Sequence, residues 1–78
     1  MIPDDARIAE VLMDMAERRG VSKSFCPSEA ARALSDDWRP LMPAIRRVAA
    51  SLPLAATQGG RRVDAVRTRG PIRLCLAR

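Results

Sequence analysis

Seven arginines in the second half of the chain are the side chains best suited to chemistry, and that chemistry is the binding of phosphate. Arginine presents a planar set of N–H donors that can clamp a phosphate or read guanine O6 and N7. Three of these residues fall in a predicted helix and four in a predicted hairpin: Arg39, Arg46 and Arg47, then Arg61, Arg62, Arg67 and Arg69. We expect them to form a nucleic-acid-binding surface, and the alternative is a solvated basic surface that binds nothing.

The net charge of +5 divides unevenly along the chain. Residues 1–37 carry five basic and eight acidic side chains, a net charge of −3. Residues 38–78 carry nine arginines and a single acid, Asp64, a net charge of +8. Such a division predicts that the second half faces a polyanion, whereas the first half does something else.

Length and composition argue against an enzyme. A chain of 78 residues makes one domain, predicted to span residues 1–78, because it buries only about 60–65% of its unfolded surface. There is no histidine, and no phosphate-binding glycine loop, GxSxG motif or cysteine cluster. Asp36 and Asp37 precede a predicted helix, where aspartate is typical of a cap. We therefore expect no catalytic residue, metal, cofactor or small-molecule substrate.

The two cysteines and the absence of a long apolar run indicate a cytoplasmic protein. Cys26 and Cys75 lie 49 positions apart, which fits neither a metal motif nor a disulfide scaffold. If the segment 24–26 pairs with the strand 71–76, the two thiols approach each other, and a redox switch becomes the alternative. No run reaches the roughly 18 apolar residues that cross a bilayer, and the start MIPDDAR is acidic, unlike a signal peptide.

Hydrophobic spacing predicts three helices. The first runs from Pro3 to about Arg19, with apolar residues at helical spacing and Gly20 at its end. The second runs from Pro27 to about Leu34, with Ala30, Ala33 and Leu34 facing inward. The third begins between Trp38 and Pro43 and ends near Leu52. Its predicted inner face holds Leu41, Met42, Ile45, Val48, Ala49 and Leu52, and its outer face holds Arg39, Pro43, Arg46, Arg47 and Ala50.

The last third of the chain changes to the spacing of β-strands. Leu54–Gln58 and Arg61–Val66 are predicted strands joined at Gly59-Gly60, a strong hairpin signal. The stretch 68–71 is a predicted loop, and 72–76 alternates like a half-buried strand. A short extended segment, 21–26, separates the first two helices and turns Phe25 inward. The predicted fold is mainly α with a small β-hairpin: a winged helix-turn-helix of three helices and a two- or three-stranded antiparallel wing.

Several separated motifs also resemble a small bacterial family known only as a domain of unknown function. They are the stretch CPSEAARAL at 26–34, Trp38-Arg39 with Leu41-Met42-Pro43, Arg46-Arg47, Gln58-Gly59 with Arg61 and Val63-Asp64, and the closing GPIRL at 70–74. The resemblance covers roughly residues 5–77. It implies a winged-helix fold and brings no activity, substrate or catalytic residues.

Duplex DNA is the predicted partner, contacted more through phosphates than through bases. The outer face of the third helix offers no Asn or Gln for base readout, and only Phe25 and Trp38 are aromatic, too few to stack unpaired bases. Trp38 is expected to pack between the second and third helices. The alternative function is a protein-interaction module that binds no nucleic acid, in which the first or second helix meets a protein partner or a second copy in a homodimer.

Overall fold

The first helix, α1, spans Asp5–Arg19 in the computed structural model, which describes residues 3–77. Asp4 is the N-cap, because its carboxylate accepts the backbone N–H of Arg7 at 2.8 Å. The predicted start at Pro3 was therefore two residues early. Gly20 ends the helix at a φ of +81°, a conformation that favours glycine.

The second helix, α2, spans Pro27–Leu34, as predicted. Pro27 occupies the first turn, and the Glu29 carboxylate reaches back to the backbone N–H of Cys26 at 2.9 Å. Its inner face differs from the prediction in one residue, because Ala31 is fully buried and Ala33 is exposed. Small side chains at Ala30 and Ala31 let the other helices approach closely.

The third helical segment contains a break that resolves its two prolines. A short 3-10 helix, η1, spans Arg39–Leu41, and α3 follows at Met42–Ala50. Pro40 and Pro43 each lie in the first two positions of their own segment, where no N–H is required. The helix ends two residues before the predicted Leu52. Leu41, Ile45, Val48 and Ala49 are buried as predicted, and Met42 and Leu52 are half-buried.

The sheet has three antiparallel strands in the order β2-β1-β3. Strand β1 spans Leu54–Gln58, β2 Arg61–Arg62 and β3 Arg73–Leu76. The main ladder joins β1 to β3, from Leu54 opposite Leu76 to Thr57 opposite Arg73. The predicted strand Arg61–Val66 was wrong beyond Arg62, since the chain turns at Asp64 instead of continuing along β1.

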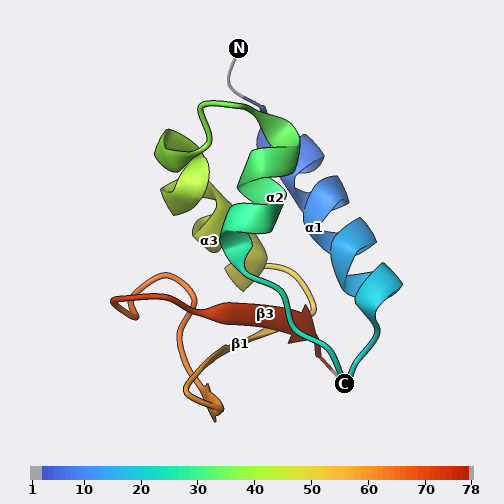
Figure 1. The fold of residues 1–78 in the computed structure, drawn as a ribbon, viewed down its shortest axis with the longest axis vertical. Helices are drawn as coiled ribbons and strands as arrows, with labels where there is room; N and C mark the ends of the chain where they lie inside the picture. The colour runs from blue at the N-terminus through green and yellow to red at the C-terminus, as the bar shows by residue number, and fades with distance from the viewer. Residues whose placement is uncertain (1–2, 78) are drawn as a thin grey trace.

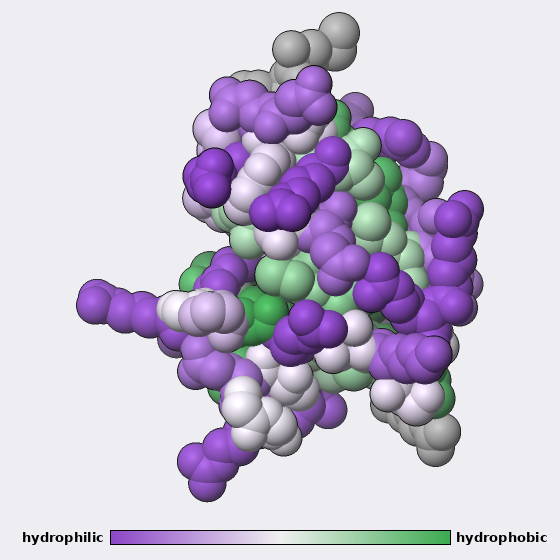
Figure 2. Space-filling model, in the orientation of Figure 1, coloured by the Kyte–Doolittle hydropathy of each residue, from purple (hydrophilic) through white to green (hydrophobic). Residues whose placement is uncertain are grey.

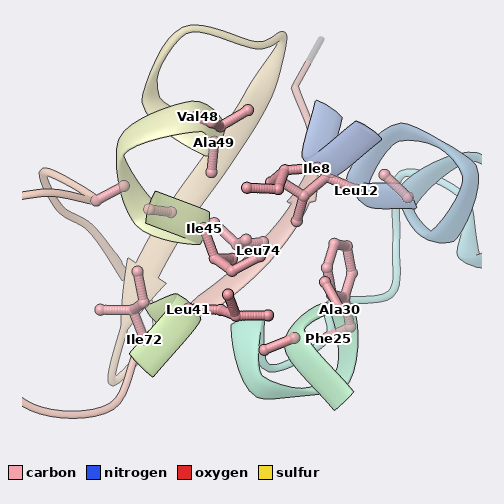
Figure 3. Close-up of a cluster of buried hydrophobic side chains, with 14 residues drawn as sticks. Ile8, Leu12, Phe25, Ala30, Leu41, Ile45, Val48, Ala49, Ile72 and Leu74 are labelled. Carbon is pink, nitrogen blue, oxygen red and sulfur yellow. The ribbon is translucent and has the colours of Figure 1, made fainter. Parts of the chain in front are cut away.

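The core lies between the helices and the sheet. Phe25 is fully buried, and its backbone exchanges two hydrogen bonds of 2.8 Å with Leu74 of β3, so the predicted pairing of the segment 24–26 with 71–76 is confirmed. Figure 3 shows side chains of α1, α3 and β3 converging around Ile45 and Leu74. Cys26 and Cys75, on these neighbouring segments, are both free thiols.

The three helices pack together on one side of the sheet, and the strands cross beneath them (Figure 1). The connection from β1 to β3 includes β2, and its later part, the loop that leads into β3, projects to the side of the molecule beyond the helices (Figure 1). This is the layout of a winged helix-turn-helix, with three helices and a three-stranded antiparallel sheet. Among residues 3–77, no helix is long and apolar enough to cross a membrane.

Candidate nucleic-acid interface

The connection between β1 and β3 gathers four of the seven predicted arginines. We call residues 59–71 the wing. Arg61, Arg62, Arg67 and Arg69 are all exposed. Within residues 3–77, none of the four pairs with a carboxylate. Figure 2 shows long hydrophilic side chains extending into solvent on the side where the wing projects.

The side chain of Asp64 shapes the wing. Its Oδ1 accepts the backbone N–H groups of Val66 at 2.8 Å and of Arg67 at 3.0 Å. This Asx turn diverts the chain from the sheet. Within the turn, the side chain of Ala65 is buried. The N–H groups of Arg67 and Val66 lower the pKa of the Asp64 carboxyl, and the positive charge of Arg67 adds to the effect.

Two side chains from the body of the protein hold the remainder of the wing. Arg46 of α3 donates from Nη1 to the carbonyl oxygen of Thr68 at 2.6 Å and from Nη2 to that of Gly70. Gln58 of β1 donates from Nε2 to the carbonyl oxygens of Arg69 at 2.7 Å and Pro71 at 3.1 Å. Four consecutive carbonyl groups, 68–71, are thus bound by the helix and the sheet, which anchors the backbone at Arg69.

Arg46 was predicted to face a ligand, and the structure places its two terminal nitrogens on the wing backbone. Arg47 is also engaged within the protein. Its Nη1 and Nη2 lie 2.7 and 2.9 Å from the two carboxylate oxygens of Asp5 in α1. The hydrogen bonds from Arg47 lower the pKa of Asp5, and the Asp5 carboxylate raises the pKa of Arg47. The arginine pair of α3 therefore joins α3 to the wing and to α1.

Arg39 lies at the opposite end of this helical segment, as the first residue of η1. Its guanidinium carbon is 4.7 Å from the centre of the Trp38 ring, and that of Arg32, in the last turn of α2, is 4.6 Å from the same ring. Trp38 is half-buried and packs against the core. Arg32 was missed from the sequence, and its spacing from Trp38, six residues across a turn, gave no signal.

Charges in the first half of the chain are arranged differently, in pairs. Arg7 pairs with Glu10 and Arg18 with Asp14 along α1, and Arg19 of α1 pairs with Glu29 of α2 at 2.6 Å. The first two pairs border a groove of about 700 Å³ beside α1 and α2, which Val11, Met15 and Ala33 also line. Paired charges leave this groove without a net electrostatic preference for an anion.

The remaining arginine of the sheet, Arg73, also binds within the protein. It donates to Oγ and to the carbonyl oxygen of Ser24, at 3.0 and 2.9 Å, and so reinforces the bridge between the segment 24–26 and β3. No group of three or more Cys, Asp or Glu side chains gathers among residues 3–77 in a way that would hold a metal ion. The chemistry of the described surface is therefore that of exposed guanidinium groups.

Fold and surface together define a small winged-helix domain with a basic wing. Sequence comparison agrees with the predicted resemblance: the family described as "Protein of unknown function (DUF3253)" matches residues 5–77. The chain belongs to this family. A search of the curated proteins finds no match to this chain.

Proposed function

We propose that this protein binds duplex DNA through phosphate contacts made by the wing and by Arg39. The observation that carries the proposal is the set of four exposed arginines on the wing, which have no carboxylate partner among the described residues while their backbone is anchored. A guanidinium that has no internal partner keeps its N–H donors available to a phosphate, and an anchored backbone limits the ordering cost of binding to the side chain itself.

Contacts with phosphate are favoured over base readout because α3 offers few groups to the major groove. Both its arginines are bonded within the protein, and Pro43 and Ala50, exposed on the same helix, carry no hydrogen-bonding side chain. Direct readout requires Arg, Asn, Gln or similar groups directed at base edges. Binding should therefore depend weakly on DNA sequence and strongly on salt.

A duplex suits this surface better than a single strand. Phe25 is fully buried, and the Trp38 ring carries the guanidinium groups of Arg32 and Arg39. No aromatic face among residues 3–77 is therefore free to stack successive unpaired bases. We also propose that the protein acts in the cytoplasm, because its two cysteines lie 49 positions apart, which does not fit a disulfide scaffold.

Fluorescence anisotropy of a labelled duplex, measured at several salt concentrations, tests the proposal. Contacts with about 3 to 5 phosphates predict a plot of log affinity against log salt with a slope of about −3 to −5. A labelled single strand of the same length should bind more weakly. Failure to bind any duplex at about 50 mM salt, where phosphate contacts are strong, would overturn the proposal. A protein partner that is pulled down from lysate and remains bound after nuclease treatment and at high salt would then favour the interaction-module alternative.

A further inference from the structure

The turn between α2 and η1 holds two arginines on a single indole ring. Arg32 comes from the last turn of α2, and Arg39 is the first residue of η1. Their guanidinium carbons lie 4.6 and 4.7 Å from the centre of the Trp38 ring. The two cations are therefore no farther apart than these two distances combined. We call Arg32, Trp38 and Arg39 the arginine–tryptophan stack.

Like charges this close repel each other unless something offsets the repulsion. The electron-rich π system of the indole ring attracts both guanidinium groups and holds them close to the ring. Both arginines are exposed, and neither forms an ion pair within residues 3–77. Their N–H donors therefore remain available to a ligand with several acceptor oxygens, and a phosphate group is such a ligand.

Two acids lie in the same turn and must be counted. Asp36 and Asp37 are exposed, and the backbone N–H of Asp37 is bonded to Oγ of Ser35 at 3.2 Å. Neither carboxylate pairs with an arginine among the described residues. Because they lower the local positive potential, they should weaken the binding of an anion, and their removal should strengthen it.

We propose that the arginine–tryptophan stack is a second phosphate-binding site, which holds the backbone of the duplex at the start of α3 while the wing holds it elsewhere. The inference rests on the proposed function. Arg39 is the first residue of η1, and Arg46 follows seven residues later in α3. The stack therefore lies at the start of the third helical segment, whereas the wing is bound farther along it, at Arg46.

The stack assigns two different roles to its members. Arg32 and Arg39 contact phosphate, whereas Trp38 is a positioning residue that acts through them. Arg32→Gln and Arg39→Gln should each make the salt slope less negative by about 0.9. Arg18→Gln, on the exposed side of α1, changes the net charge equally and should leave the slope unchanged. Asp36→Asn with Asp37→Asn should tighten binding.

Replacing Trp38 separates positioning from charge. Trp38→Leu keeps the net charge but removes the cation–π contacts, so affinity should fall about two- to fivefold. Trp38→Phe retains an aromatic face and should recover most of this loss. Circular dichroism melting identifies any variant that fails to fold. Arg32 and Arg39 are exposed in the wild type, so their variants still test the proposal if Trp38→Leu does not fold.

Trp38 is the only tryptophan of the chain, so its emission reports directly on the stack. Titration with a duplex should change the emission of the wild-type protein saturably, with the same midpoint as the anisotropy. Arg32→Gln should weaken both signals together. If the duplex binds but the emission stays constant and Arg32→Gln and Arg39→Gln keep the wild-type slope, the stack proposal and the proposed contact of Arg39 are wrong, and the wing contacts stand. If the wild-type protein binds no duplex, the stack proposal and the proposed function are both wrong.

Discussion

The arginines of α3 and those of the wing have the same chemistry and opposite roles. Arg46 and Arg47 donate to groups of the protein itself, two wing carbonyls and the Asp5 carboxylate. The wing arginines have no carboxylate partner within residues 3–77 and extend into solvent. An arginine can thus either hold elements of the protein together or remain free to bind an external anion. The arginines of α3 therefore hold the surface together, and under the proposed function the wing arginines are the ones that contact DNA.

The same distinction separates the two halves of the chain. In α1 and α2, Arg7, Arg18 and Arg19 each face a carboxylate. In the second half, only Arg47 has an acidic partner among the described residues. Asp64, the one acid there, binds backbone N–H groups instead. Arg78, part of the +8 charge, lies outside the described residues. Among residues 3–77, three of the five basic residues of the first half thus pair with a carboxylate, against one of the eight arginines of the second half.

Neutralising the wing should have the largest effect. The triple variant Arg61→Gln, Arg62→Gln and Arg69→Gln removes three proposed phosphate contacts, so the salt slope should become less negative by about 2.7. Affinity at about 100 mM salt should fall at least 100-fold, because each contact releases a counterion. The melting temperature should hardly change, since these side chains have no partners to lose among residues 3–77. Anisotropy and circular dichroism measure the two quantities.

A matched variant controls for net charge. Arg7→Gln, Arg18→Gln and Lys23→Gln together remove three positive charges from exposed positions of the first half. We expect the slope of log affinity against log salt for this variant to be close to that of the wild type. Equal losses in the two triple variants would show that overall charge, and not the wing, drives binding.

Arg46→Met should have the next largest effect, and mainly on the order of the wing. The carbonyl groups of Thr68 and Gly70 lose their charged donor, which should cost about 1–2 kcal/mol of stability. Amide hydrogen exchange should accelerate in residues 64–71, and affinity for the duplex should fall as the wing loses its anchor. Arg47→Met is the control, because its partner is in α1. Unchanged exchange in the wing of Arg46→Met would refute the anchoring role.

Acid should produce the smallest effect. The pKa values of Asp5 and Asp64 are lowered in the folded protein, by the hydrogen bonds from Arg47 and by backbone N–H groups, respectively. Such groups stabilise the fold above the ordinary aspartate value of about 3.9, and this stability is lost as the pH falls below it toward the folded values. The melting temperature should therefore decline between about pH 5 and pH 3.

Substitution by asparagine sharpens this test. Asp64→Asn keeps an acceptor oxygen for the N–H groups of Val66 and Arg67 but cannot titrate, so the wing should no longer loosen in acid. Asp5→Asn should remove the corresponding change at the junction of α1 and α3. Amide exchange measured at pH 5 and at pH 3 distinguishes the two sites. Identical acid responses in wild type and Asp64→Asn would exclude a role for this carboxylate.

Local signals predicted the elements whose ends are set by their own residues. The bounds of α2 follow from Pro27, and those of β1 from the turn at Gly59-Gly60. The prediction of a strand from Arg61 to Val66 was wrong beyond Arg62 because the Asp64 side chain competes for backbone N–H groups. The alternation of apolar and polar residues does not reveal such a side-chain contact. The roles of Arg46 and Arg47 were hidden for another reason. Their partners lie 22 to 42 residues away, so only the folded chain brings them together.

Mapping the contact surface residue by residue shows whether the wing and Arg39 meet the duplex. Amide chemical shifts of the labelled protein, recorded by NMR while a duplex is added, show which elements meet the DNA. We predict shifts in the wing, residues 59–71, and at the start of the third helical segment around Arg39, with α1 unchanged. Shifts centred on α1, or none at a salt concentration of about 50 mM, where phosphate contacts are strong, would contradict the account.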